Sequence, residues 1–250
     1  MTSVCPFSGK EKVWEIQEAK QKKRIAVVGA GPAGLQAAWI LGKRGHDVTV
    51  YEKENMAGGQ YRLAAVPPMK QELSKTIVTY LAFCRKYHVR ICYHTRADRS
   101  LLDQGKFDEI ILASGASPLV PNIPGIEQDH VYLANDILRF RTLLQNQSIV
   151  VLGAGLVGLE TAQVLAGFGN QVTVVDLLKQ PAPQAPARPR ENLLSHLKEL
   201  HVTLLMGRKI TCIHEDGISC EKDGAVERLG TFNSVVVALG SRPERVFDEE

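Results

Sequence analysis

Two glycine clusters in this sequence share the same spacing and the same surroundings. Gly-Ala-Gly-Pro-Ala-Gly at 29–34 follows the apolar run 25–28, and Gly-Ala-Gly-Leu-Val-Gly at 153–158 follows the apolar run 149–152. In a strand–turn–helix unit, the first glycine allows the sharp turn, the second lets a pyrophosphate approach the backbone, and the third brings helix and strand together. The pyrophosphate would lie at a helix N-terminus, where unpaired N–H groups and the helix dipole favour negative charge. Each cluster therefore predicts a dinucleotide-binding turn.

A carboxylate follows each cluster at the same distance. Glu52 stands 18 residues after Gly34, and Asp176 stands 18 residues after Gly158. Each ends a β-branched run, where a carboxylate can accept hydrogen bonds from ribose hydroxyls. At Asp176 it would also repel the 2′-phosphate of NADPH, so NADH is preferred over NADPH. Lys179, which is close in sequence, moderates that preference.

The elements that must position these residues occur twice. A strand, a tight turn, a helix and a second strand are expected at 25–52 and again 124 residues later. The buried strand expected at 235–240 resembles the one expected at 107–113. Between these elements, the pattern of residues 71–86 predicts a helix, and the pattern of residues 202–227 predicts short strands joined as hairpins. The expected fold class is α/β, with two nested Rossmann-like domains, parallel sheets and a β-hairpin layer.

Composition narrows the possible functions. The chain has 250 residues, of which 44% are hydrophobic and 23% charged, as in a soluble globular protein. Its 30 basic and 27 acidic residues are spread along the sequence, so no nucleic-acid partner is expected. No apolar stretch reaches the roughly 18 residues that span a membrane. The first twenty residues also lack the apolar core of a signal peptide, so a cytoplasmic protein without a membrane partner is expected.

The cysteines and histidines show no spacing typical of a redox or metal site. The five cysteines include no Cys-x-x-Cys, which fits a reducing compartment and argues against a disulfide reductase. The seven histidines share no metal-ligand spacing, so no metal site is predicted.

The motifs together resemble those of the flavoproteins with two dinucleotide-binding domains, which include thioredoxin and glutathione reductases. The resemblance rests on the two glycine clusters, Glu52, Gly58-Gly59-Gln60 and Ala113-Ser114-Gly115. Within this superfamily the chain is most similar to the C-terminal half of the Old Yellow Enzyme-related reductases, such as 2,4-dienoyl-CoA reductase and trimethylamine dehydrogenase. The stretches 59–68 and 107–115 carry this closer similarity.

The resemblance implies three segments. These are an FAD-binding domain at 1–120, an NAD(P)H-binding domain at 121–240, and at 241–250 the start of a segment that returns to the flavin domain. The prolines within 118–125 favour an extended connector, and a second proline-rich stretch, 181–189, precedes a helix expected at 191–200. Relatives complete the flavin domain with a Gly-Asp motif that this sequence does not reach, so its flavin domain is expected to be incomplete at the C-terminus.

The resemblance also implies an NAD(P)H:flavin oxidoreductase module, in which NADH reduces FAD. In relatives the electrons continue through a 4Fe-4S cluster to FMN in a separate barrel domain, or to another redox partner. The 4Fe-4S cluster and the FMN domain are expected only in other parts of a parent enzyme. A cluster normally needs four thiolates, and only Cys5 stands near the position of the relatives' cluster ligands. Cys5 is therefore interpreted as an ordinary thiol. Since the cofactors carry the chemistry, no catalytic side chain is predicted.

Cofactor-binding residues are carried over from the resemblance. For FAD they are Gly29, Gly31, Pro32, Ala33, Gly34, Glu52, Lys53, Gly59, Gln60, Arg62, Ala97, Ala113, Ser114 and Gly115. For NAD(P)H they are Gly153, Gly155, Leu156, Val157, Gly158, Glu160, Asp176 and Gly240. Ala97 is expected to face adenine through its backbone, and Glu160 to lie near the nicotinamide amide. Alternatively, Arg62 is a solvated charge, Gly59 only a turn residue, and Glu160 a charge on a helix surface.

Two other functions stay open at this point. The chain could be a non-catalytic scaffold that binds an adenine nucleotide such as ADP, as one site of trimethylamine dehydrogenase-like relatives does. It could also be a self-contained NADH oxidase or ferredoxin reductase. The sequence does not identify the final electron acceptor.

Overall fold

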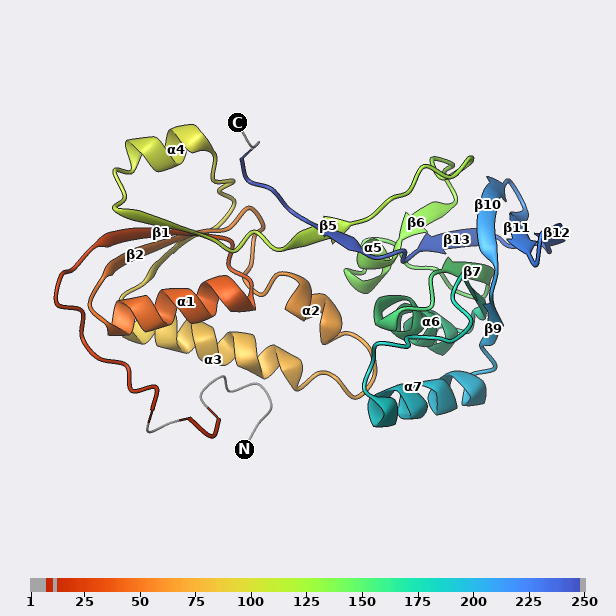
Figure 1. The fold of residues 1–250 in the computed structure, drawn as a ribbon, viewed down its shortest axis with the longest axis horizontal. Coiled ribbons are helices and arrows are strands. Elements are labelled where there is room, and N and C mark those ends of the chain that lie inside the picture. Colours follow the sequence, from red (N-terminus) through yellow and green to blue (C-terminus); the bar gives the residue numbers. More distant parts are fainter. Residues whose placement is uncertain (1–7, 11–12, 248–250) are drawn as a thin grey trace. The chain divides into compact units, whose positions relative to one another are not determined.

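The computed structural model describes residues 8–10 and 13–247, which form two compact units (Figure 1). Unit 1 contains the described residues up to Ala65, then Lys70–Ala116 and the residues from Pro243 onward. Unit 2 contains Val66–Met69 and Ser117–Arg242. Strands β5 (Ala116–Pro118) and β14 (Ser241–Pro243) pair with each other where the chain passes from one unit to the other. No helix among these residues is long and apolar enough to cross a membrane.

Unit 1 is built on a parallel sheet with the strand order β3-β2-β1-β4. Its strands are β1 (Arg24–Val28), β2 (Asp47–Tyr51), β3 (Arg90–Cys92) and β4 (Glu109–Leu112). Its helices are α1 (Pro32–Lys43), α2 (Gln60–Ala64), α3 (Leu73–Lys86) and α4 (Arg99–Gln104). Figure 1 shows α1 and α3 on one side of the sheet and α4 on the other. Alternate residues of β1 serve the two faces, because Val27 packs with α1 and α3 whereas Ala26 and Val28 pack with Leu102 of α4.

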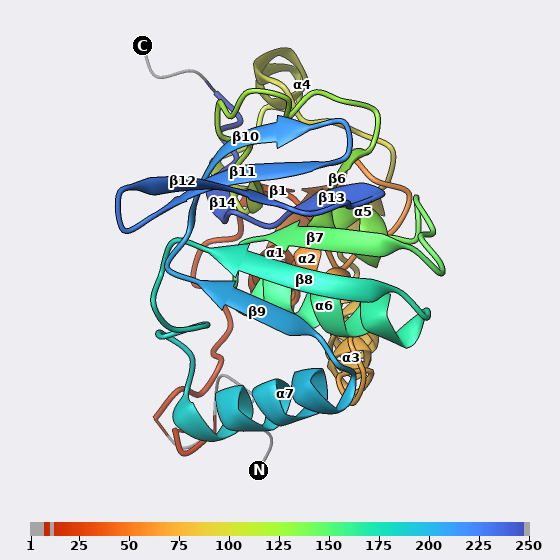
Figure 2. The same cartoon turned by 90° about the vertical axis from the view of Figure 1, so that its right-hand side faces the viewer.

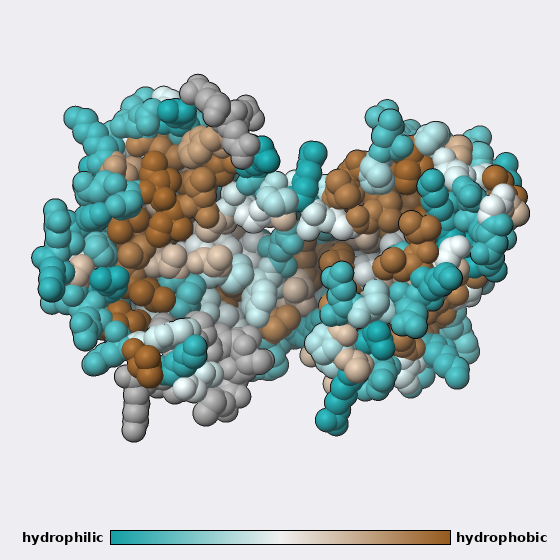
Figure 3. Space-filling view, in the orientation of Figure 1, coloured by the Kyte–Doolittle hydropathy of each residue, from teal (hydrophilic) through white to brown (hydrophobic). Residues whose placement is uncertain are grey.

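Strand β4 forms one edge of this sheet. Ile110 and Leu112 are 42% and 52% exposed, and apolar surface gathers in Figure 3 where β4 runs in Figure 1. The corresponding strand of unit 2, β13 (Ser234–Val237), lies between two other strands and is buried along its length. The two sheets therefore differ at this position, where no described strand pairs with the outer side of β4.

Unit 2 combines a parallel and an antiparallel sheet (Figure 2). The parallel sheet has the order β6-β13-β7-β8-β9, with β6 (Val131–Leu133), β7 (Ser148–Leu152), β8 (Gln171–Asp176) and β9 (Thr203–Met206). The antiparallel sheet contains β10 (Lys209–His214), β11 (Gly217–Lys222) and β12 (Ala225–Leu229). The helices are α5 (Ala134–Leu138), α6 (Leu156–Gly167) and α7 (Ala187–Glu199). Apolar side chains cover both faces of the parallel sheet, those of α6 and α7 on one and Ile213 and Ile218 on the other.

A buried asparagine fixes the starts of two of these strands. The Asn170 Nδ2 group donates to the carbonyl oxygens of Leu144 and Leu165 at 2.9 and 2.8 Å. The Oδ1 atom accepts from the Gln147 N–H at 3.0 Å. Asn170 thus ties the end of α6 to the residues that lead into β7, and its buried polar atoms are all paired.

The expected α/β class with parallel sheets and a hairpin layer is confirmed. Three details of the prediction are wrong. The strand expected to be buried at 107–113 is largely exposed, because β4 is an edge strand. The first strand within 202–227 does not join the hairpins, because β9 pairs in parallel with β8 at the edge of the large sheet. The helix expected at 191–200 begins earlier, at Ala187, since Pro189 fits a first helical turn, where a missing N–H leaves no hydrogen bond unmade.

Candidate dinucleotide-binding sites

The first glycine of each cluster has a backbone that disfavours other residues. Gly29 has φ +101° and Gly153 has φ +108°. A Cβ at Gly29 would collide with the carbonyl oxygen of Ala113, and one at Gly153 would collide with that of Ala238. Both the turn and the close neighbouring strand therefore require glycine here.

The third glycine of each cluster lets the helix lie against the turn. A Cβ at Gly34 would strike the carbonyl oxygen of Gly29, and a Cβ at Gly158 would strike that of Gly153. These two glycines serve the packing of α1 and α6 on their strands.

The middle glycine of each cluster has neither constraint. Gly31 and Gly155 are the N-cap residues of α1 and α6, and their φ angles of −70° and −69° suit any residue. No heavy atom lies within 4 Å of the position that a Cβ would take at either residue. Each helix N-terminus therefore faces open space that glycine leaves free.

The residues next to these N-termini are partly solvent-exposed. Pro32 occupies the first position of α1, where its fixed φ favours the helix, and Ala33 is exposed. In unit 2 the same positions hold Leu156 and Val157, which are 41% and 50% exposed.

The two carboxylates bind the glycine turns. The Ala30 N–H donates to Glu52 Oε2 at 2.7 Å, and the Ala154 N–H donates to Asp176 Oδ2 at 2.6 Å. The second oxygen of each carboxylate accepts from the backbone two residues on, at 2.9 Å for Glu52 and 2.7 Å for Asp176. The hydrogen bonds between each carboxylate and its glycine turn were not predicted from the sequence. The equal spacing between each glycine cluster and its carboxylate could have indicated them. Each carboxylate oxygen keeps a lone pair for another donor.

Further predicted residues of unit 1 lie beside its glycine turn. The Gly58 N–H donates to the Ala30 carbonyl at 2.8 Å, and a Cβ at Gly59 would come within 3.3 Å of Gly31 Cα. Gln60 donates through Nε2 to the carbonyl of Ala116. Arg62, by contrast, is exposed, which leaves its interpretation as a solvated charge open.

Glu244 joins several residues predicted to bind FAD, and sequence reasoning missed it. Its carboxylate lies 2.7 Å from Lys53 Nζ and 4.0 Å from Arg96. Its carbonyl accepts from Ser114 Oγ at 2.6 Å, and its N–H donates to the Gly115 carbonyl at 2.9 Å. No local pattern could have revealed these contacts, because they join residues more than 125 positions apart.

The segment after Glu244 also packs on unit 1. Val246 and Phe247 contact the apolar cluster that contains Ala97, which is 7% exposed. Ala97 is therefore covered by the protein itself in this arrangement.

Two predicted residues of unit 2 remain. Glu160 is 8% exposed, so its interpretation as a charge on the helix surface is wrong. Gly240 has φ +99° with open space at its Cβ position, and its carbonyl accepts from the Leu119 N–H at 2.9 Å. Cys5 lies outside the described residues.

Residues 23–250 match the sequence profile of the family described as pyridine nucleotide-disulphide oxidoreductase. The chain belongs to this family. The predicted resemblance is thereby confirmed, as is the predicted membership of an oxidoreductase family. The profile covers both glycine clusters, the two carboxylates and the residues around Glu244.

Individual relatives are larger than this chain. It is 34% identical to a bilirubin reductase of Mediterraneibacter gnavus over 234 residues, which are 93% of this chain and 36% of that protein. It is 33% identical to an NADH oxidase of Thermoanaerobacter brockii, with 96% and 38% covered. Among solved structures, a 2-naphthoyl-CoA reductase complex superposes with a TM-score of 0.86 at 28% identity, with 91% and 34% covered. The chain thus spans less than two fifths of these relatives.

Proposed function

We propose that unit 1 binds FAD, that unit 2 binds NADH, and that the chain is the NAD(P)H:flavin oxidoreductase module of a larger Old Yellow Enzyme-related enzyme. The observation that carries this proposal is the open space at Gly31 and Gly155. Neither backbone geometry nor packing requires glycine there. A ligand that approaches the backbone at both helix N-termini accounts for glycine at both positions.

The electrostatics of the two helices favour an anionic ligand. Helices α1 and α6 each have 12 residues, and neither has an acidic side chain in its first turn. The positive end of the helix dipole is therefore not neutralised within the first turn, and the first N–H groups of each helix point toward the open space. A pyrophosphate fits both conditions.

The surroundings of Asp176 favour NADH. Its carboxylate would repel a 2′-phosphate. Leu177 and Leu178, which follow it, are exposed apolar residues. The nearby Arg208, whose N–H donates to the Asp176 carbonyl, directs its guanidinium to Glu227 and to the Met206 carbonyl. That cation is therefore already engaged.

The side chains of this chain would bind and orient the cofactors. Glu52 and Asp176 would accept from ribose hydroxyls while they hold the glycine turns, and buried Glu160 would lie near the nicotinamide amide. When bound, FAD would accept a hydride from the nicotinamide and pass electrons to a 4Fe-4S cluster, FMN or a redox partner outside this chain.

A specific observation favours a second candidate, an adenine-nucleotide scaffold without redox activity. Lys53 and Ser114, two residues assigned to FAD, are engaged with Glu244. Ile110 and Leu112, on the face of β4 that α4 shares, are also exposed. If these features weaken flavin binding, unit 1 would hold only a smaller nucleotide such as ADP.

An absorbance spectrum of the purified protein, before and after NADH is added without oxygen, separates the two functions. The proposed function predicts a visible flavin band that bleaches on addition of NADH. A colourless protein that takes up no added FAD but binds ADP in a calorimetric titration would support the scaffold instead. A flavin band that NADH does not bleach would refute hydride transfer within this chain.

A further inference from the structure

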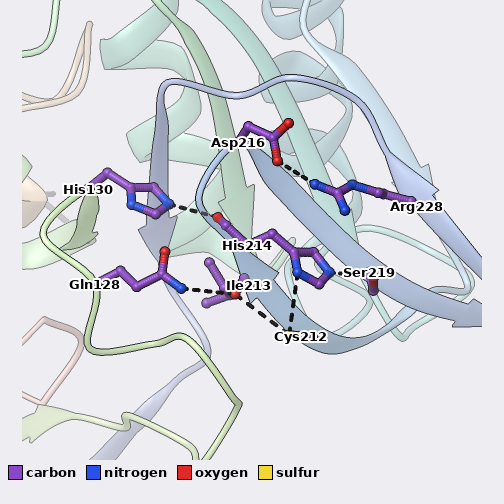
Figure 4. A network of polar contacts seen from close by, with 8 residues as sticks. All are labelled: Gln128, His130, Cys212, Ile213, His214, Asp216, Ser219 and Arg228. Carbon is purple, nitrogen blue, oxygen red and sulfur yellow. Dashed lines mark hydrogen bonds and ion pairs between the residues drawn. The ribbon is translucent and has the colours of Figure 1, made fainter.

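Three polar side chains lie together on one face of the antiparallel sheet of unit 2 (Figure 4). Cys212 and His214 are two residues apart on β10, so their side chains point to the same face. Ser219 on β11 is the register partner of Cys212. The intervening Ile213 and the neighbouring Ile218 are 1% and 0% exposed in the apolar core. The pleat therefore directs Cys212, His214 and Ser219 away from that core.

The three side chains form a hydrogen-bonded series. His214 Nε2 lies 2.7 Å from Ser219 Oγ. Cys212 Sγ lies 3.8 Å from His214 Nδ1 and 3.6 Å from the carbonyl oxygen of Ile213, so two acceptors lie within reach of the one thiol proton. With the ring proton on Nε2, His214 donates to Ser219, and Nδ1 is the acceptor of the two that can take the proton as a base. This is the order of a nucleophile, its base and a group that orients the base.

Contacts from the segment before β6 hold the backbone of this series in place. His130 Nε2 lies 3.1 Å from the His214 carbonyl, and Gln128 Nε2 donates to the Ile213 carbonyl at 3.2 Å. On the other side, Arg228 is the register partner of Ser219 and is paired with Asp216. The geometry at Cys212 is thus supported from both neighbouring elements.

The other described cysteines lack this combination. Cys84 and Cys220 are 1% and 0% exposed, and burial raises the pKa of each thiol to about 11. Cys92 is partly exposed, like Cys212. Among the four cysteines that the structure describes, only Cys212 pairs partial exposure with a hydrogen bond to an imidazole.

We propose that Cys212 is a reactive thiol that exchanges with small disulfides, with His214 as its base and Ser219 as the residue that positions His214. The thiol proton passes to His214 Nδ1 while Sγ attacks one sulfur of the small disulfide. The S–S bond of the reagent breaks and a mixed disulfide forms at Cys212. The leaving thiolate takes the proton from His214, so one small thiol is released for each Cys212 modified. This proposal is independent of cofactor binding.

The test is the reaction of the full chain with 5,5′-dithiobis(2-nitrobenzoate), with each modified cysteine assigned by peptide mass spectrometry. Cys212 is expected to react fastest of the described cysteines. The fast phase should vanish in Cys212→Ser and persist in the matched control Cys92→Ser. His214→Gln should slow it by roughly tenfold or more, because a positioned base contributes at least that much to proton transfer. Ser219→Ala should slow it less.

A second measurement needs no variant. The rate at Cys212 in the folded wild-type chain is compared with the rate in denaturant, where His214 is no longer held beside the thiol. Faster reaction in the folded state supports the proposal. A folded Cys212 that reacts no faster than Cys92, or an unchanged rate in a folded His214→Gln chain, would overturn it.

Discussion

Replacing the middle glycine of the second cluster should separate binding from folding. In Gly155→Ala the added methyl group meets no atom within 4 Å, and the φ of −69° suits alanine. Alanine is a poorer N-cap than glycine, by up to about 1 kcal/mol, but it restricts the unfolded chain, which stabilises by about 0.4–1 kcal/mol. The free energy of unfolding should therefore change by less than about 1 kcal/mol.

Dinucleotide binding should respond strongly to the same methyl group. It would occupy the space through which a pyrophosphate reaches the first N–H groups of α6. A hydrogen bond to a charged group contributes about 1.5–3 kcal/mol. Losing one such bond should raise the Kd for NADH by about 10- to 100-fold.

Gly158→Ala is the matched control, three residues away in the same turn. Its Cβ would strike the carbonyl oxygen of Gly153, a backbone atom that no side-chain rotation can remove. Overpacking of this kind destabilises by about 1–3 kcal/mol, and a rigid backbone favours the upper end. The apparent Tm should then fall by about 6–12 °C.

Differential scanning fluorimetry measures stability in both variants, and isothermal titration calorimetry measures NADH binding. We expect a stable Gly155→Ala chain that has lost affinity for NADH and a Gly158→Ala chain that has lost stability. This expectation is refuted if Gly155→Ala binds NADH as the wild type does. It is also refuted if Gly155→Ala unfolds as readily as Gly158→Ala, since glycine would then serve the fold at both positions.

Three further predictions concern other sites. Asp176→Asn should narrow the preference for NADH over NADPH by about tenfold, because the charge that repels a 2′-phosphate is removed; competition titrations with both nucleotides measure this, and an unchanged ratio would contradict it. Asn170→Ala should lower the free energy of unfolding by about 2–4 kcal/mol, since three hydrogen-bonding groups lose a buried partner; urea denaturation measures this, and a loss within experimental error would exclude it. The pKa of Cys84 is raised from 9.0 to about 11 by burial, so its contribution to stability is full below pH 9 and falls as pH rises toward 11. Denaturation at several alkaline pH values should show a smaller loss of unfolding free energy with rising pH in Cys84→Ala than in the wild type. An equal dependence of the unfolding free energy on pH in both chains would contradict the raised pKa of Cys84.

The features that the sequence predicts well are those whose residues lie close along the chain. The glycine turns, the helices that follow them and α3 depend on spacings within one strand–helix unit, so short-range patterns suffice to predict them. The carboxylates at Glu52 and Asp176 also belong to this group. Their position was predicted, while the hydrogen bonds that they accept from the turns became visible only in the structure.

The features that the sequence did not predict depend on tertiary choices. Strand β9 has the apolar pattern of a hairpin strand, but it lies at an open edge of the parallel sheet and pairs with β8. Glu244 meets Lys53 across 191 positions, and nothing near either residue indicates the other. Such contacts depend on the path of the whole chain rather than on local propensity.

The duplication within the chain separates what is common to the two sites from what distinguishes them. The three glycines have corresponding surroundings in both turns. Each carboxylate accepts from the N–H of the second residue of its glycine cluster and from the N–H two residues after the carboxylate itself. These shared contacts suit the pyrophosphate and ribose that FAD and NADH have in common, so they do not distinguish these two dinucleotides. That distinction must arise where the units differ, above all at the residue after the carboxylate. Unit 1 has Lys53 there, paired with Glu244, and unit 2 has Leu177, which is 61% exposed. A paired cation and an exposed apolar side chain offer different surfaces to an adenosine. We therefore expect Lys53 and Leu177 to contribute to cofactor selectivity.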